Sequence, residues 1–457
     1  MPFNNQAHTI YFLGIGGIGM SALARYFIAK GYFVHGYDRT KTALTAELEN
    51  EGMIIHYEED ISLIPDEIKL VIYTPAIPKT NIEYQFIERS GIPMMKRAEV
   101  LGNLSTEYKT IACAGTHGKT TTSTLVSYLL HESHVGCQAF LGGISRNFEN
   151  NLLLSDTSPF MVAEADEFDR SFLHLKPTIA IITSVDADHL DIYGSPDSLK
   201  KAFTEFTGKI VPHGTLIIKK GIELPLALPS ESNCLTYAVD EEADYYASNI
   251  SLVGGLYHFD LHHAEGTIEN LVLGIPGFYN VENAVAALAA ALLCGATPME
   301  LREGLSSFKG VRRRFDIRLN LNGLVYIDDY AHHPQELKAC ISSARAMFKG
   351  RRLTGIFQPH LFTRTRDFAE GFAEVLCLLD EIMLLPIYPA RELPIPGIDS
   401  ELLLSLISHR NKILISKDEL PEYLKGKHIE VLLTMGAGDI DTLVEPIEKY
   451  LLKCKIG

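Results

Sequence analysis

Short apolar runs recur along this chain, and segments with helical periodicity separate most of them. A short run of this kind predicts a buried β-strand, and its alternation with helices predicts a mostly parallel sheet. The runs that fit this pattern are residues 9–13, 32–37, 70–73, 111–114, 160–163, 178–183, 324–327, 352–357, 381–385 and 431–434. The pattern therefore predicts an α/β protein, with further strands and few motifs between residues 214 and 273.

The chain is long enough for several α/β units. Its 457 residues exceed what one hydrophobic core usually holds, which suggests about three domains. The polar stretch 102–108 is typical of a linker, and we place the domains at 1–107, 108–318 and 319–457. We expect a Rossmann-like N-terminal domain, a central P-loop-type ATPase domain with a mostly parallel sheet, and a C-terminal Rossmann-like α/β domain.

Composition narrows the class of protein. Hydrophobic residues make up 46% and charged residues 21% of the chain, as in ordinary soluble globular proteins. With 41 Lys and Arg against 57 Asp and Glu, the net charge is −16, which argues against a nucleic-acid or anionic-membrane partner. An anionic substrate must therefore meet locally placed Lys and Arg side chains.

Cysteine usage and the chain ends point to a reducing compartment. The 7 cysteines are scattered and never form a Cys-x-x-Cys pair, which disfavours a disulfide framework and a structural zinc site. The first residues lack a signal-peptide pattern, and no segment is apolar enough to span a bilayer. We therefore expect a cytoplasmic protein.

The most informative stretch is a glycine-spaced loop that leads from the strand at 111–114 into a helix. Its residues are Gly115, Thr116, His117, Gly118, Lys119, Thr120 and Thr121. Such a loop holds nucleotide phosphates with its amides, with the helix N-terminus and with the Lys119 ammonium, while the Thr120 hydroxyl binds Mg²⁺. Cys113 replaces the usual first glycine, so the loop is a shortened variant. A strand–turn–helix with a chance lysine is the alternative.

A second glycine-rich turn follows the first strand. Gly14, Gly16, Gly17, Ile18 and Gly19 form a dinucleotide fingerprint, and Asp38 ends the second strand where a ribose-binding carboxylate is expected. The physics requires only a diphosphate at a helix N-terminus, so NAD, FAD and a UDP-sugar all fit. A tight turn that needs glycines for packing is the alternative.

Two further residues lie near the predicted ligand edge of this first sheet. Thr74 opens a stiff, proline-bounded loop after the third strand, where ligands of open α/β sheets bind. Arg97 begins a helix, and the sequence leaves open whether it faces an anionic group or solvent.

Two acidic clusters end central strands. Glu164, Asp166, Glu167 and Asp169 follow the strand at 160–163, and Asp186, Asp188, His189 and Asp191 follow the strand at 178–183. Carboxylates gathered at a strand end are costly unless they meet a cation, and Mg²⁺ needs only one or two of them. The clusters favour a metal site, with a structural role for His189 as the alternative.

Two later segments carry polar groups that suit a nucleotide. Asn280 and Asn283 lie at the entry of an alanine-rich helix, where an asparagine either caps the helix or bonds an adenine edge. The run from Lys309 to Arg314 is a basic segment in an acidic chain. Because arginine suits forked phosphate recognition, we favour a γ-phosphate clamp over a solvated run.

The C-terminal third delivers polar side chains at the carboxyl ends of its strands, so its loops are expected to converge on one edge. The relevant residues are Asp328, Asp329, Tyr330, His332, His333, His360 and Arg364. Adjacent histidines point apart on an extended backbone, so we favour substrate contact over a zinc site for His332 and His333.

Taken together, these motifs resemble the Mur ligases, the ATP-dependent amino-acid ligases of peptidoglycan synthesis, over nearly the whole chain. The resemblance rests on residues 14–21, 115–122, 164–167, 188–191, 313–315, 328–334 and 357–360. It implies a UDP-binding domain, an ATPase domain and a C-terminal domain that closes over the site. It also implies ligation of L-alanine to the carboxylate of UDP-N-acetylmuramate through an acyl phosphate, with ATP and two Mg²⁺ ions, in a bacterial monomer or weak homodimer.

The resemblance also implies roles for single residues. The residues expected to bind the UDP-sugar are Gly16, Gly17, Ile18, Gly19, Asp38, Thr74 and Arg97. Those expected to bind Mg²⁺ are Thr120, Glu164 and His189. The phosphate loop is expected to bind ATP together with Asn283, Arg313 and Asp329. The residues expected to bind the amino acid are Tyr330, His332, His360 and Arg364. The catalytic residues are Lys119 and Arg313, with Asp329 or His332 as the base.

The sequence departs from the family where a histidine usually precedes Asn280, because Tyr279 stands there; the exact adenine contact is therefore open. Lys200 and Lys201 are not assigned as a carbamylated lysine, a device of related ligases.

Three rival functions remain. A ligase that attaches a whole tripeptide to the same sugar nucleotide more often carries alanine in place of Leu190. An NAD-dependent dehydrogenase leaves Lys119, Glu164 and His189 unexplained. A non-catalytic nucleotide-binding regulator does not need the metal cluster, the arginine run and the third domain together.

Overall fold

The computed structural model describes residues 8–186, 190–321, 323–390 and 392–456. The chain separates into two compact units. Unit 1 comprises Met1–Ile250, Phe259–Val272 and Glu282–Lys309, and unit 2 comprises Ser251–His258, Leu273–Val281 and Gly310–Gly457. Each unit is described by itself.

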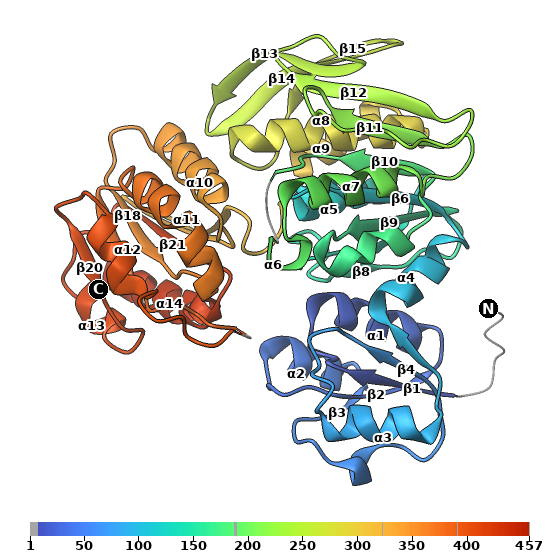
Figure 1. Cartoon of the computed structure of the whole chain (residues 1–457). Helices are drawn as coiled ribbons and strands as arrows, with labels where there is room; N and C mark the ends of the chain where they lie inside the picture. Colours follow the sequence, from blue (N-terminus) through green and yellow to red (C-terminus); the bar gives the residue numbers. More distant parts are fainter. Residues whose placement is uncertain (1–7, 187–189, 322, 391, 457) are drawn as a thin grey trace. The chain divides into compact units, whose positions relative to one another are not determined.

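Unit 1 begins with a parallel sheet in the order β3-β2-β1-β4-β5, drawn in blue in Figure 1. Side chains alternate along β1, so Ile10 and Phe12 pack with α1 and α4, while Tyr11 and Leu13 pack with α3. The elements are β1 (Thr9–Leu13), α1 (Ile18–Ala29), β2 (Phe33–Tyr37), α2 (Ala43–Asn50), β3 (Ile54–His56), η1 (Ile61–Leu63), β4 (Ile68–Tyr73), α3 (Ile82–Ser90), β5 (Met94–Lys96) and α4 (Arg97–Ser105).

The second sheet has the order β15-β14-β13-β12-β11-β10-β6-β9-β7-β8. Its strands from β13 to β7 pair in parallel, and β8 is antiparallel to β7. The unit boundary falls within β13, β14 and α8. The strands are β6 (Lys109–Ala114), β7 (Gln138–Phe140), β8 (Leu152–Leu153), β9 (Phe160–Ala165), β10 (Ile179–Ile182), β11 (Thr215–Lys219), β12 (Asn233–Val239), β13 (Tyr245–Val253), β14 (Leu256–His263) and β15 (Gly266–Val272).

The helices of this second sheet are α5 (Lys119–Glu132), η2 (Phe168–His174), α6 (Leu190–Tyr193), α7 (Pro196–Thr207), α8 (Phe278–Leu293) and α9 (Pro298–Ser307). Strand β6 lies between β9 and β10, and Cys113 pairs with Glu164 on one side and with Ile181 on the other. The carboxyl ends of these three strands therefore lie at one edge, where ligands of open α/β sheets bind.

Unit 2 is built on a six-stranded sheet in the order β16-β17-β21-β18-β19-β20, parallel except for β16. Helices α10, α11 and α12 cover one face, and α13, η3 and α14 cover the other (orange to red in Figure 1). The elements are β16 (Asp316–Leu321), β17 (Leu324–Asp329), α10 (Pro334–Met347), β18 (Leu353–Phe357), α11 (Phe362–Leu376), β19 (Glu381–Leu384), α12 (Ser400–Leu406), β20 (Lys412–Leu414), α13 (Leu420–Leu424), β21 (Val431–Met435), η3 (Asp439–Leu443) and α14 (Val444–Ile456).

The ten predicted strands are all present, and so are the strands expected between 214 and 273. The linker predicted at 102–108 is wrong in its first half, because α4 continues through Ser105. Gly102 packs against His174 so closely that a Cβ would lie 2.7 Å from its carbonyl oxygen. A glycine that suggested a linker instead allows close packing of this helix. Among the helices of the described residues, none is long and apolar enough to cross a membrane.

Candidate active site

A cavity of about 260 Å³ lies in unit 1, between elements of its two sheets. The first turn of α1, Thr74 and Arg97 line it from the first sheet, and Gly142, Glu164 and Phe168 line it from the second. The cavity therefore joins the glycine-rich turn to the acidic strand end, two features that the sequence predicted to bind ligands.

The turn before α1 needs its glycines for space. A Cβ at Gly14, where φ is +88°, would lie 2.6 Å from a Thr74 methyl carbon. A Cβ at Gly19 would lie 2.7 Å from an Arg97 guanidinium nitrogen. Arg97 therefore lies across the first turn of α1, where unsatisfied amides carry partial positive charge. The predicted UDP-sugar residues that line the cavity are Gly17, Ile18, Gly19, Thr74 and Arg97.

The Asp38 carboxylate binds the backbone of the same turn. Its Oδ2 accepts a hydrogen bond from Gly16 N at 2.8 Å, and its Oδ1 accepts one from Thr40 N at 3.1 Å. Each carboxylate oxygen has a second lone pair, so a ribose hydroxyl can still be bound. The ribose role of Asp38 stays a prediction, while its role in holding the turn is visible.

The phosphate loop before α5 is anchored by the end of β10. The Ser184 hydroxyl accepts a hydrogen bond from His117 N at 2.8 Å and lies 2.8 Å from the Thr116 hydroxyl. Gly115 has φ +137°, and a Cβ there would lie 2.0 Å from the Thr183 hydroxyl. The loop thus depends on glycine and on the hydroxyl groups of Thr183 and Ser184, which no sequence motif marked.

Lys119 bonds to its own loop and to a buried carboxylate. Its ammonium donates to Gly115 O at 2.7 Å and to Glu167 Oε1 at 2.9 Å. Burial lowers the pKa of Lys119, but the charges of Glu167 and the neighbouring acids outweigh it and raise the pKa above its usual range. Burial raises the pKa of Glu167 to about 7, although Lys119 opposes this shift. The sequence showed Glu167 without revealing this partnership.

Asn283 joins the phosphate loop from a distant helix. Its Oδ1 accepts a hydrogen bond from the Thr122 hydroxyl at 3.3 Å, and a Cβ at Gly118 would lie 2.5 Å from the same oxygen. The structure therefore brings this predicted ATP residue against the loop. Thr120 and Thr121 are buried in the first turn of α5.

The predicted metal ligands are only partly described. Glu164 is the second-last residue of β9 and lines the cavity, and a Cβ at Gly142 would lie 2.1 Å from the Glu164 carboxylate. His189 lies outside the described residues. Within the described ranges, no group of three or more His, Cys, Asp and Glu side chains is arranged to hold a metal. The set of Thr120, Glu164 and His189 stays a prediction.

In unit 2, Asp329 is a buried carboxylate at the end of β17. It accepts hydrogen bonds from Phe315 N at 2.6 Å and Ala331 N at 2.7 Å. Burial raises its pKa to about 7, and the nearby Arg314 opposes the rise. Such a pKa suits proton transfer near neutral pH, in line with its prediction as a base.

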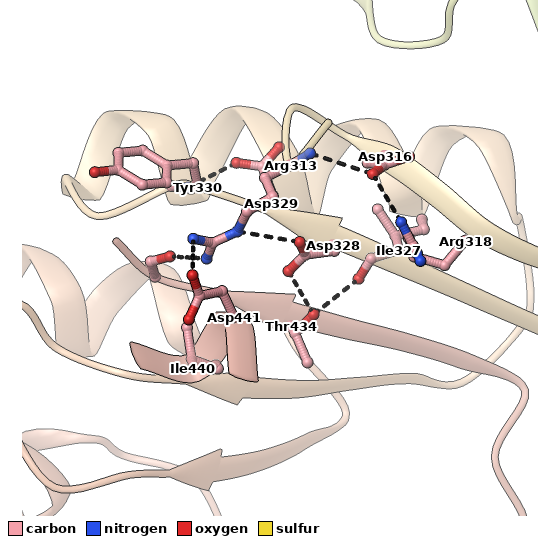
Figure 2. Close-up of polar contacts among 12 residues, drawn as sticks. Arg313, Asp316, Arg318, Ile327, Asp328, Asp329, Tyr330, Thr434, Ile440 and Asp441 are labelled. Atoms are coloured by element: carbon pink, nitrogen blue, oxygen red, sulfur yellow. Dashed lines mark hydrogen bonds and ion pairs between the residues drawn. The ribbon is translucent and has the colours of Figure 1, made fainter. Parts of the chain in front are cut away.

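Arg313 is held by its own unit, as Figure 2 shows. Its Nε lies 3.2 Å from the buried Asp328 carboxylate, its Nη2 donates to Gly436 O at 2.6 Å, and its Nη1 lies 3.7 Å from Asp441. The guanidinium also lies 5.1 Å from the ring centroid of Tyr330, as does that of Arg314. The phosphate role of Arg313 stays a prediction. Its observed contacts join it to the ends of β17 and β21.

The residues that were predicted to bind the amino-acid substrate lie together in unit 2. The rings of His332 and His360 are 6.1 Å apart, and an Arg364 nitrogen lies 3.4 Å from His360 Nδ1. His332 Nδ1 lies 2.9 Å from Tyr330 O, which joins the fourth member of the set. His333 instead caps α10, where its side chain accepts a hydrogen bond from Gln335 N.

Tyr279, which stands where the family usually has histidine, is partly buried in unit 2. Burial raises its pKa well above the usual range, and the charge of Asp329 adds to the shift. Asn280 beside it donates to Pro276 O at 2.6 Å and so fixes the turn before α8. Tyr279 therefore belongs to the surroundings of Asp329.

Three family models match successive parts of the chain. The "Mur ligase family, catalytic domain" matches residues 9–109, the "Mur ligase middle domain" matches 113–291, and the "Mur ligase, glutamate ligase domain" matches 313–438. This succession agrees with the three-domain α/β fold.

Individual proteins match over almost the full length. The UDP-N-acetylmuramate–L-alanine ligase of Porphyromonas gingivalis is 51% identical over 97% of this chain and 98% of its own. The enzyme of that name from Flavobacterium johnsoniae is 45% identical, with 98% of each chain covered. The structure of the UDP-N-acetylmuramate–alanine ligase of Thermotoga maritima superposes with a TM-score of 0.83 at 29% identity, over 97% and 99% of the chains. The chain belongs to the Mur ligase family.

Proposed function

We propose that this chain is an ATP-dependent ligase that joins L-alanine to the carboxylate of UDP-N-acetylmuramate in peptidoglycan precursor synthesis. The observation that carries the proposal is the cavity that holds both Arg97 with the first turn of α1 and Glu164, one strand from the phosphate loop. A ligand with a diphosphate at one end and a carboxylate at the other fits such a cavity. The names and full-length similarity of the relatives support these substrates.

The diphosphate of the UDP-sugar binds at the first turn of α1. The amides of Gly17, Ile18 and Gly19 and the Arg97 guanidinium supply positive charge in a chain of net charge −16. Asp38 binds the ribose, and Thr74 closes the turn. In this arrangement the muramoyl carboxylate extends toward Glu164.

In the first chemical step the muramoyl carboxylate attacks the γ-phosphorus of ATP. The bond from that phosphorus to the bridging oxygen breaks, ADP leaves, and an acyl phosphate forms. Lys119 exchanges Glu167 for phosphate oxygens, and the loop amides from Gly115 to Thr121 cradle the nucleotide. Asn283 contacts the nucleotide beside the loop. For Arg313 to act on the γ-phosphate, its fork must first leave Gly436 and Asp441.

The residues at the end of β9 fit a divalent cation. Glu164 supplies a carboxylate with close-packed Gly142 above it, and Thr120 supplies a hydroxyl, which are oxygen ligands of the type that Mg²⁺ prefers. With His189 they would hold the ion, and we propose two ions in all. Bound Mg²⁺ supplies neutralisation of the phosphate charge.

In the second step the amine of L-alanine attacks the acyl carbon, the amide bond forms, and inorganic phosphate leaves. A base must take a proton from the alanine ammonium before the attack. Asp329, with a pKa of about 7, or His332 takes this proton. Arg364 pairs with the alanine carboxylate, and Tyr330 and His360 complete its contacts.

The remaining properties follow the same proposal. We place the domain boundaries at 1–107, 108–318 and 319–457. The reaction takes place in the bacterial cytoplasm, on a monomer or weak homodimer.

Phosphate release from ATP tests the proposal. The purified protein is incubated with ATP, Mg²⁺ and UDP-N-acetylmuramate, and then with L-alanine, other amino acids or the tripeptide. We expect release and a new UDP-linked product with L-alanine. Release with the tripeptide alone would assign the rival ligase, and a nicotinamide absorbance change would assign a dehydrogenase.

A further inference from the structure

One asparagine ties the first turn of α1 to the second sheet of unit 1. Asn151, immediately before β8, is fully buried. Its Nδ2 donates to Ile18 O at 2.7 Å and to the Ser21 hydroxyl at 2.9 Å, and its Oδ1 accepts a hydrogen bond from Arg25 Nη1 at 2.6 Å. All three partners belong to α1, so the amide of Asn151 is spent entirely on this helix.

The Arg25 end of this contact is itself fixed. Arg25 is buried, and its Nε and Nη2 bind the Glu51 carboxylate at 2.9 Å and 2.7 Å, which leaves Nη1 for Asn151. A forked guanidinium held at two points has little freedom to follow a displaced partner. The orientation of the Asn151 amide is therefore set from both of its polar atoms.

The backbone of Asn151 reaches the other wall of the cavity. Its carbonyl oxygen accepts a hydrogen bond from Leu141 N at 2.9 Å. Leu141 precedes Gly142, and Gly142 lies against the Glu164 carboxylate so closely that a Cβ would be 2.1 Å away. Contacts thus run from Ile18, in the diphosphate-type turn, through Asn151 and the Leu141–Gly142 segment to Glu164.

We infer that Asn151 is a positioning residue that sets the separation between the diphosphate-binding turn and Glu164 for a ligand that spans both. The inference rests on the proposed function, because it takes UDP-N-acetylmuramate as that spanning ligand. Asn151 is not among the residues that line the cavity, whereas its partner Ile18 is. It acts through the two walls that it joins.

Two ligands of different length separate positioning from general stability. UDP reaches only the turn of α1 and Arg97, whereas UDP-N-acetylmuramate also reaches the Glu164 side. A shift between the walls weakens the long ligand and leaves the short one unchanged. Partial unfolding weakens both ligands equally. Reacting groups misplaced by about 1 Å lose up to about 100-fold in rate.

Asn150 provides a matched control in the same turn. Its Oδ1 accepts hydrogen bonds from Asn151 N at 2.7 Å and Leu152 N at 3.1 Å, so Asn150→Ala removes two local bonds. Within the described part of the chain, the hydrogen bonds of the Asn150 side chain stay inside this turn and do not reach α1. The control therefore perturbs the turn without releasing the helix.

The test measures the dissociation constants of UDP and UDP-N-acetylmuramate by calorimetry, and kcat per ADP-binding site, for wild type, Asn151→Ala and Asn150→Ala. We expect Asn151→Ala to weaken UDP-N-acetylmuramate about 10-fold or more and to lower kcat per site about 10- to 100-fold, with UDP binding within about twofold. We expect Asn150→Ala to leave all three values within about twofold. Equal weakening of both ligands, equal effects of the two variants, or no effect of Asn151→Ala would overturn the inference.

Two further variants cover the case in which Asn151→Ala does not fold. Asn151→Asp keeps an acceptor for Arg25 but sets a carboxylate oxygen against Ile18 O, so we expect the same selective loss for the long ligand. Ser21→Ala removes one of the three bonds, and we expect a smaller loss of the same kind. An equal loss for UDP in these variants counts against the inference. Failure of the proposed function appears separately, as wild type that releases no phosphate with UDP-N-acetylmuramate and alanine.

Discussion

The two glycine-rich turns of unit 1 both lead from a parallel strand into a helix, yet their cations are held in different ways. At the turn before α1, Arg97 comes from another helix, and within the described part of the chain no hydrogen bond or ion pair engages its guanidinium. At the turn before α5, the loop's own Lys119 bonds to a loop carbonyl and to the buried Glu167. An anion at the first turn would displace no side-chain partner of Arg97. An anion at the second turn would have to displace Glu167 from Lys119.

The difference follows from where each cation is buried. Lys119 is only 13% exposed, and an unpaired ammonium at such a place would be costly, so a carboxylate must balance it when no phosphate is bound. Arg97 lines the cavity and is only partly buried, so solvent can reach its guanidinium. We infer that nucleotide binding at the second turn is an exchange of anions, whereas UDP-sugar binding at the first is an addition.

The largest effect is expected at Lys119. In the proposed mechanism Lys119→Ala removes the cation that stabilises the transferring phosphoryl group, and we expect phosphate release to fall about 1,000-fold or more. Lys109→Ala is the matched control, because Lys109 begins β6, the strand that leads into the loop, and its ammonium lies over the Phe160 ring. The control should stay within about twofold. Undiminished turnover of Lys119→Ala would remove the loop from the mechanism.

Arg313 extends the comparison to a cation whose guanidinium nitrogens all contact groups of its own unit. Arg313→Lys cannot reproduce the fork on Asp328 and Gly436, so we expect the free energy of unfolding to fall by about 2–3 kcal/mol in a urea titration. Arg345→Lys is the control, because its pair with Asp380 is half exposed and should contribute less than about 1 kcal/mol. Equal losses of stability would show that the fork of Arg313 has no special role.

Arg97 should show the smaller effect of an added partner. In the proposed complex Arg97→Ala removes one charge-assisted contact to the diphosphate, and we expect the KM for the UDP-sugar to rise about 10- to 30-fold. The KM for ATP should not change, since Arg97 belongs to the first turn. Arg89→Ala, at an exposed position of α3, should leave both constants alone. A rise in both KM values after Arg97→Ala would contradict the assignment of Arg97 to one turn.

The sequence predicted much of the fold because strands and turns are local patterns. Each of the ten predicted strands is present, and the turns at Gly14 and Gly115 stand at strand ends as expected. Most of the misses are short segments, and one is the six-residue antiparallel strand β16. The two-residue β8 carries too little periodicity to detect, and the polar end of α4 was predicted as a linker although Gly102 packs tightly there.

The sequence predicted the residue types of the site better than the contacts between these residues. Glycine, lysine and carboxylate patterns marked the loop and the end of β9, because phosphate and Mg²⁺ chemistry restricts those types. The pairing of Lys119 with Glu167 joins residues 48 positions apart, and the contact of Asn151 with α1 spans 126 to 133 positions. Such contacts depend on tertiary packing, which one sequence does not display.

Glu167 gives the smallest and most specific effect. If Lys119 must exchange Glu167 for phosphate, Glu167→Gln removes the competitor, and we expect ADP without metal to bind about three- to tenfold more tightly at pH 8. Near pH 6 the wild-type carboxyl is already largely protonated, because burial raises its pKa to about 7, and the two proteins should bind ADP alike. The measurement is a calorimetric titration at each pH.

The sign of this pH dependence separates exchange from simple stabilisation. When Lys119 moves to phosphate, Glu167 loses its cation and takes up a proton, so wild-type affinity weakens relative to Glu167→Gln as the pH rises through about 7. The difference between the proteins is the readout, because the phosphates of ADP also titrate. The free energy of unfolding follows the same sign: the contribution of a carboxyl with a raised pKa is present below about 4.5 and is lost through about 7. A constant affinity ratio across this range would mean that Lys119 keeps Glu167 when the nucleotide binds.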